Sequence, residues 1–279
     1  MASTTCECGG GLCLQYSTDG RYLHHRLTAP ANLMDRERVL HVWALQLLKN
    51  PLLASQIAFG DYEDVSFVHS RPRLVSSTLD SAEDRFLYLP ESDASADIIG
   101  LYLNGPRSLS SDRLAMLVVA DKGEGSYEVM LCATHYLGDG MALHTFMNEF
   151  YQLLGDTANT VSAITASIRD EIARVTGIPP SLEDRMPKVG NGSALARAIG
   201  AVDNRRNDSK LIGGQAFPGA KIKKQRHTLV PTFAYSEAET KAILGKCKAN
   251  GATIAHAMFA LCNIAWARRI DAKARVDPR

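Results

Sequence analysis

YEVMLCATHYLGDGMALHTFMNEFYQLL, residues 127–154, decides the fold because its periodicity changes midway. Apolar residues first alternate with small or polar ones, which is typical of a strand. They then recur at spacings of three and four, which marks one face of a helix, through Leu143, Phe146, Met147, Phe150 and Leu154. The stretch therefore predicts a strand that runs into a helix, with residues 135–140 at the corner.

The corner carries the pattern His-x-x-x-Asp-Gly, and its histidine is the candidate catalytic residue. Histidine is the only side chain whose unperturbed pKa lies near neutrality, so His135 can accept a proton from a substrate and return it. Asp139 can cap the helix by accepting backbone N–H bonds, and Gly140 keeps the corner free of bulk. The alternative is a satisfied structural histidine beside a common Asp-Gly turn.

Composition indicates an ordinary globular protein of one large or two modest domains. The chain has 279 residues, of which 46% are hydrophobic and 22% charged, and its net charge of +1 argues against a nucleic-acid partner. The longest apolar run, Leu114–Ala120, is far too short to cross a bilayer, and the first residues lack a secretory layout. We expect a cytoplasmic protein without a membrane partner.

The six cysteines do not predict a disulfide framework or a metal site. The spacing of Cys6, Cys8 and Cys13 fits no metal-binding pattern. The remaining three, Cys132, Cys247 and Cys262, fall within strand or helix patterns and are expected to be small buried hydrophobes in a reducing compartment.

Before the corner, the sequence alternates between helix and strand signals, after a weakly patterned stretch at 1–20. A helix is expected after Asp35 and ends at Asn50-Pro51. Two strands, 52–59 and 65–71, flank an acidic turn, and short apolar pieces follow at 86–89 and 98–103. Residues 114–120 should pair with 127–134 as a hairpin, inside a sheet that is covered on both faces.

After the corner, a helix over 164–175 should end at Gly177 and Pro179-Pro180. Residues 181–225 lack a period and are expected to form a long crossover, where Gly190-x-Gly192 is only a very weak nucleotide signal. A strand over 227–233 is then followed by a helix with a capping box at Ser236–Glu239, and by a second helix from Ile254 that ends near Arg268-Arg269.

The run ATHYLGDGMALHTFMNEF resembles the active-site segment of the CoA-dependent acyltransferase superfamily. This superfamily includes BAHD acyltransferases, trichothecene-type acetyltransferases, chloramphenicol acetyltransferase and nonribosomal peptide condensation domains. The stretch Asn50-Pro51-Leu52-Leu53 and the later helix pair resemble it too. Condensation domains usually have a histidine where this chain has Thr134, so the resemblance favours a stand-alone enzyme that acts on a small molecule.

The resemblance implies an α/β fold with a mixed sheet and the two-lobe architecture of chloramphenicol acetyltransferase. Residues 1–177 would form the first lobe with the HxxxDG motif, 178–225 the crossover, and 226–279 the beginning of the second lobe. His135 would act as general base in transferring an acyl group from acyl-CoA, a co-substrate and not a resident cofactor, to a hydroxyl or amine. Asp139 and Gly140 would be structural.

One departure opens an alternative function. The second signature of the family, Asp-Phe-Gly-Trp-Gly, does not occur in the sequence, and members are longer, so the chain resembles a shortened member. It would then be a catalytically silent homologue that binds a small molecule or a partner, with self-association through the incomplete second lobe. The basic run of Lys221, Lys223, Lys224 and Arg226 could meet a CoA phosphate, although a solvated loop is the plainer interpretation.

Overall fold

The computed structural model describes residues 3–9, 20–59, 64–174, 177–180, 185, 194–210 and 228–276. The chain divides into two compact units, Met1–Pro187 and Lys188–Arg279, which are described separately below. The corner and its motif belong to the first unit.

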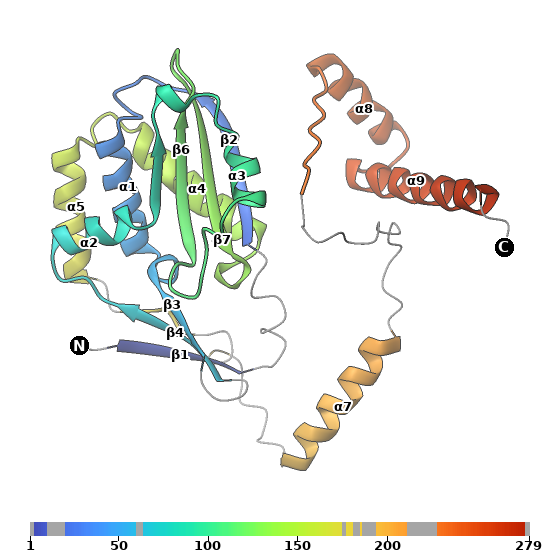
Figure 1. Ribbon diagram of the computed structural model, residues 1–279, viewed down its shortest axis with the longest axis horizontal. Helices are drawn as coiled ribbons and strands as arrows, with labels where there is room; N and C mark the ends of the chain where they lie inside the picture. Colours follow the sequence, from blue (N-terminus) through green and yellow to red (C-terminus); the bar gives the residue numbers. More distant parts are fainter. Residues whose placement is uncertain are drawn as a thin grey trace. The chain divides into compact units, whose positions relative to one another are not determined.

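A four-stranded mixed sheet forms the centre of the first unit (Figure 1). Its order is β2-β7-β6-β5, where β7 is antiparallel to both neighbours and β5 is parallel to β6. The strands are β2 (Gly20–Thr28), β5 (Phe86–Leu89), β6 (Ala115–Asp121) and β7 (Ser126–Thr134). The expected hairpin is confirmed, because β6 and β7 pair directly across the turn at 122–125.

Helices cover both faces of this sheet, which confirms the expectation for the apolar run 114–120. Residues 117, 119, 129 and 131 face the main core, which they share with α1 (Arg36–Lys49), α2 (Val75–Glu83), α4 (Gly140–Gly155) and α5 (Val161–Arg174). Residues 118, 120, 130 and 132 face the other way and pack against α3 (Ile98–Asn104). Alternation along each strand thus sends successive side chains into two separate cores.

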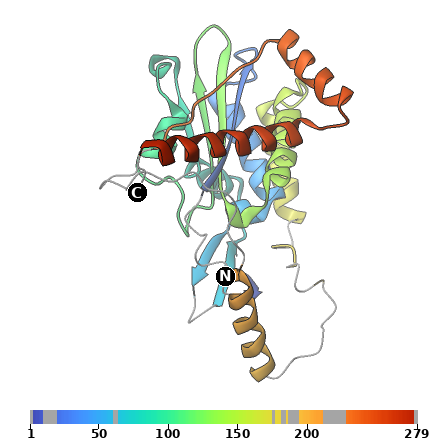
Figure 2. The ribbon, with the colours of Figure 1, turned by 90° about the vertical axis from the view of Figure 1, so that its right-hand side faces the viewer.

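A second, smaller sheet lies apart from the first, as Figures 1 and 2 both show. It consists of β1 (Ser3–Gly9), β4 (Asp64–Ser70) and β3 (Gln56–Phe59) in the order β1-β4-β3, all antiparallel. The pairing of β3 with β4 confirms the expected hairpin partners, whose turn at 60–63 lies outside the described residues. Residues 3–9 form a strand although the sequence of 1–20 is only weakly patterned.

Several boundaries in the first unit differ from the prediction for local reasons. Residues 52–54 are not strand but belong to the 3-10 helix η1 (Pro51–Ala54), because Pro51 at its start favours a helical turn. The apolar piece at 98–103 is α3, which Asp97 caps through the Gly100 amide at 2.9 Å. Neither α2 nor β2 was predicted from the sequence. The helices predicted after Asp35 and over 164–175 are confirmed as α1 and α5.

The second unit contains α7 (Ala194–Lys210), α8 (Glu237–Ala249) and α9 (Ile254–Val276). Helix α7 corrects the expectation of an unstructured crossover, and the capping box that starts α8 is confirmed. Residues 228–233 are not a strand, since no described segment of this unit pairs with them. Helix α9 continues to Val276, so Arg268 and Arg269 do not mark its end.

Candidate functional site

The backbone that leads to the corner is fixed from both sides. Thr134, the last residue of β7, donates its N–H to the carbonyl of Leu114 at 2.8 Å and lies opposite Gly20 of β2. The side chain of Thr134 is buried as well. The sheet therefore holds the chain firmly up to the residue before His135.

His135 opens the 3-10 turn η3 (His135–Leu137), and its side chain is exposed. Among the described residues, no hydrogen bond or ion pair engages either ring nitrogen. Buried polar side chains usually form hydrogen bonds within the protein, whereas the ring of His135 is exposed and forms none with the described residues. Here both nitrogens remain available to a substrate.

Asp139 has the capping role that the sequence predicts. Its Oδ1 accepts the N–H of Ala142 at 2.9 Å, which satisfies one of the open amides at the start of α4. The carboxylate is exposed and forms no ion pair within the described ranges.

Gly138, which the sequence analysis did not single out, is the sterically constrained glycine of the corner. Its φ of 150° and ψ of 178° lie in a region that only glycine adopts readily. A Cβ there would also lie 2.7 Å from the Cβ of Ala142. At Gly140, by contrast, a Cβ would meet no atom within 4 Å. The turn therefore depends on Gly138 for its shape.

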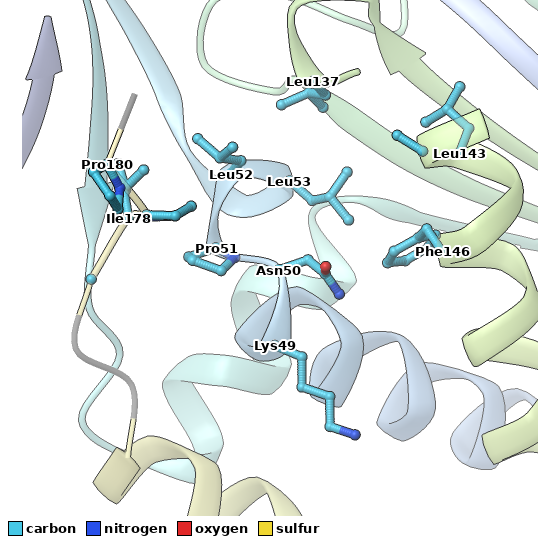
Figure 3. Close-up of a pocket in the computed structure, with 13 residues that line it drawn as sticks. Lys49, Asn50, Pro51, Leu52, Leu53, Leu137, Leu143, Phe146, Ile178 and Pro180 are labelled. Atoms are coloured by element: carbon cyan, nitrogen blue, oxygen red, sulfur yellow. The ribbon is translucent and has the colours of Figure 1, made fainter. Parts of the chain in front are cut away.

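An apolar pocket of about 470 Å³ adjoins the corner (Figure 3). Three segments line it: the end of α1 with η1, the corner with the start of α4, and residues 177–180. Sequence reasoning missed this pocket, although it had noted Asn50-Pro51-Leu52-Leu53 as part of a resemblance and Gly177 with Pro179-Pro180 as a helix terminator. Both signals lie on its walls.

A second group of titratable side chains lies where β2 meets α4, away from the corner. Nδ1 of His25 and the hydroxyl of Tyr151 are hydrogen-bonded at 2.9 Å, and the ring centroids of His25 and His144 are 6.5 Å apart. Burial lowers the pKa of His25, and the neighbouring His144 and His24 lower it further. Burial also raises the pKa of the Tyr151 hydroxyl. These groups stabilise the contact between β2 and α4.

The remaining sequence candidates do not add to the site. No three His, Cys, Asp or Glu residues of the described segments are grouped closely enough to hold a metal ion. Cys132 is buried as expected, and burial raises the pKa of its thiol to about 12. Cys247 is half-buried and Cys262 is exposed, so the prediction is wrong for these two. The basic run at 221–226, Gly190, Gly192 and Cys13 lie outside the described residues. Within the described ranges, no helix has both the length and the apolar character needed to cross a membrane.

Comparison with solved structures finds similar folds at low sequence identity. TRI3 trichothecene 15-O-acetyltransferase from Fusarium sporotrichioides matches with a TM-score of 0.50 and 14% identity, over 72% of this chain and 45% of TRI3. SgcC5 from Streptomyces globisporus matches at 0.46 and 16%, over 90% of this chain and 54% of its own. TRI101 of F. sporotrichioides, complexed with coenzyme A and T-2, matches at 0.38 and 13%, over 59% and 44%. No family model and no curated protein matches the sequence.

These likenesses define the class of fold. The chain has an α/β fold with a mixed sheet, a fold that it shares with TRI3, and the predicted α/β class is confirmed. The chain spans about half the length, or less, of the structures that it resembles. At identities of 13–16% the resemblance extends to the fold alone.

Proposed function

We propose that the chain transfers an acyl group from acyl-CoA to a hydroxyl or amine of a small molecule, with His135 as the general base. The observation that carries the proposal is the exposed His135 ring, which has no partner among the described residues and stands where a firmly held strand turns into a helix. The acyltransferase-like fold, seen most clearly in TRI3, supports the same reaction class.

The chemistry needs only one proton carrier. A ring nitrogen of His135 would take the proton of the acceptor's hydroxyl or amine as that oxygen or nitrogen forms a bond to the thioester carbonyl carbon. When the carbon–sulfur bond breaks, the imidazolium would return the proton to the departing thiolate of CoA. No acyl-enzyme forms, and acyl-CoA acts as a co-substrate. Asp139 would hold the corner by its cap to α4.

The division of the chain into a first lobe at 1–177, a crossover at 178–225 and a second lobe that begins at 226 remains a prediction. The chain spans 45% of TRI3, so the activity of the whole is proposed from the corner and the fold together.

The test is release of the CoA thiol from a panel of acyl-CoAs, with and without candidate alcohols and amines. His135→Ala should lower acceptor-dependent release by roughly 10²- to 10⁴-fold, the usual contribution of a positioned general base. Because the side chain is exposed, circular dichroism and the unfolding midpoint should not change. The matched control is Met141→Ala, a neighbouring side chain that is 72% exposed. Unchanged turnover in His135→Ala would remove the histidine from the mechanism.

A specific observation favours the second candidate, a catalytically silent homologue that acts by binding. No described residue of the second unit is buried, and large apolar side chains on it are exposed, among them Leu229, Phe233, Met258 and Phe259 at 57–80%. Exposed apolar surface of this kind marks interaction sites. This candidate predicts no acceptor-dependent thiol release by the wild-type chain, together with self-association; a fully active monomer would contradict it.

A further inference from the structure

We infer that the pocket beside the corner binds an uncharged hydrocarbon group of one of the two substrates. The chain would then prefer either an acyl group longer than acetyl or an acceptor with a larger carbon skeleton. The inference rests on the proposed function and adds a specificity site to it. The pocket volume of about 470 Å³ falls within the range of small-molecule sites.

Most of the pocket wall is apolar, with a smaller polar part. Leu52 and Leu53 come from η1, and Leu143 and Phe146 come from the first two turns of α4. Figure 3 shows Leu137 and Leu143 on one side and Ile178 and Pro180 on the other. A hydrocarbon group would exchange water for these side chains with a gain in free energy that grows with its buried area.

The pocket shares its wall with the catalytic corner. Leu137 is the last residue of η3, the 3-10 turn that begins with His135, and a 3-10 helix rises only about 2 Å per residue. Ala142 and Leu143 line the pocket from the other end of the corner. The pocket and the corner therefore share the turn η3 and the start of α4.

The polar residues of the lining do not favour a charged occupant. No carboxylate lines the pocket. The amide of Asn50 is already engaged, since its Nδ2 donates to the carbonyl oxygen and to Oε1 of Gln46, both at 3.1 Å. Figure 3 shows the ammonium of Lys49 directed away from Leu52 and Leu53. The phosphates of CoA thus find no partner inside, and an acyl chain or the carbon skeleton of the acceptor does.

Two substrate series distinguish these sources. In one, straight-chain acyl-CoAs from acetyl to decanoyl are titrated into the His135→Ala protein by calorimetry, where turnover does not interfere. In the other, 1-alkanols from propanol to decanol are titrated in the presence of acetyl-CoA. In one series the affinity should rise about fourfold for each buried methylene, until the pocket is full. The series in which affinity rises shows whether the acyl group or the acceptor occupies the pocket.

Two substitutions on opposite walls test the place of binding. Ile178→Trp and Ala142→Leu each reduce the pocket volume, and either should cut the affinity ratio of the longest to the shortest ligand by about tenfold or more. The matched control is Leu101→Trp on α3, which is 56% exposed and lies on the other side of the sheet. It should leave the ratio unchanged. Circular dichroism identifies any variant that fails to fold.

The outcomes separate the pocket from the reaction. Flat affinity in both series, or a rise that folded pocket variants retain, would overturn the inference. A rise that the pocket variants abolish supports it, even if the wild-type chain releases no CoA thiol. In that case acyl transfer fails and apolar binding stands.

Discussion

At the scale of single residues, the corner depends on one glycine more than on the other. Gly138 has a backbone conformation that side chains rarely adopt, and a Cβ there would approach the Cβ of Ala142 to 2.7 Å. Gly140 starts α4 with open space around it. The glycine that the HxxxDG pattern specifies is Gly140. The position that sterically requires glycine is Gly138, which the pattern leaves open.

Gly138→Ala should destabilise the chain by roughly 1–3 kcal/mol, the cost of holding an alanine in a glycine-only region. Gly140→Ala is the matched control and should leave stability unchanged, or raise it by up to about 1 kcal/mol, because alanine favours a helix. Urea unfolding followed by circular dichroism measures both. Equal effects of the two substitutions would contradict this account of the corner.

His69 makes the first unit sensitive to acid. The residue is 4% exposed on β4, and neither ring nitrogen has a hydrogen-bond partner among the described residues. Burial, aided by the nearby Arg85, lowers its pKa from the ordinary 6.5. Below pH 6.5, His69 therefore binds a proton in the unfolded chain but stays neutral in the folded chain. The free energy of unfolding should fall as the pH falls from about 6.5 toward the lowered pKa.

The check is the free energy of unfolding measured between pH 7.5 and pH 5. His69→Leu should flatten the loss at the acid end but not abolish it, since the pKa of His25 is lowered too. The control Ser70→Leu alters the same strand at an exposed position without removing a titratable group. If His69→Leu keeps the full acid slope, the ring is not the source.

At the scale of elements, the start of α4 connects the sheet to the corner. Asp139→Ala should cost about 1 kcal/mol, because the amide of Ala142 loses its partner and the helix start loses a negative charge. Asp139→Asn keeps the amide's acceptor and should cost only a few tenths. Thermal unfolding of the two variants compares them; an Asn variant as damaged as the Ala variant would show that the charge, and not the cap, is what matters.

The same element shows why much of the fold could be predicted from sequence. Residues 143, 146, 147, 150 and 154 of α4 are all buried, because a helix with a single apolar stripe can pack in only one way. β6 could be predicted as well, because a strand that is buried on both faces has an unbroken apolar sequence. The starts of α1 and α8 could be predicted from their capping residues, Asp35 and Ser236, because a helix cap is also a local sequence signal.

The elements that escaped prediction lack such local signals. β2 carries the polar residues His24, His25 and Arg26 at its centre, and it is a strand because it pairs with β7 along its whole length. Helix α7 has only three large apolar residues, Leu195, Ile199 and Val202, which are exposed, and its second half is polar. The pocket forms from three segments that are far apart in the chain, so it could not be predicted from any single stretch of sequence. His135, Asp139 and Gly140 were found because they lie within six consecutive residues.

At the scale of the whole molecule, the two units bury their side chains to very different extents. The first has a core of 25 buried residues, and Trp43 within it is fully buried. In the second, none of the described side chains is buried. Stability follows the apolar area removed from water, so the two units should not unfold as one.

The chain's two tryptophans allow this difference to be measured, because Trp43 lies in the first unit and Trp266 in the second. In Trp266→Phe, fluorescence reports the first unit and should show one steep urea transition. In Trp43→Phe it reports the second unit, which should change at lower urea with a shallower slope. If the second unit associates with another copy, its transition alone should move to higher urea as the protein concentration rises. Transitions that coincide at every concentration would instead show that the two units unfold as one cooperative body.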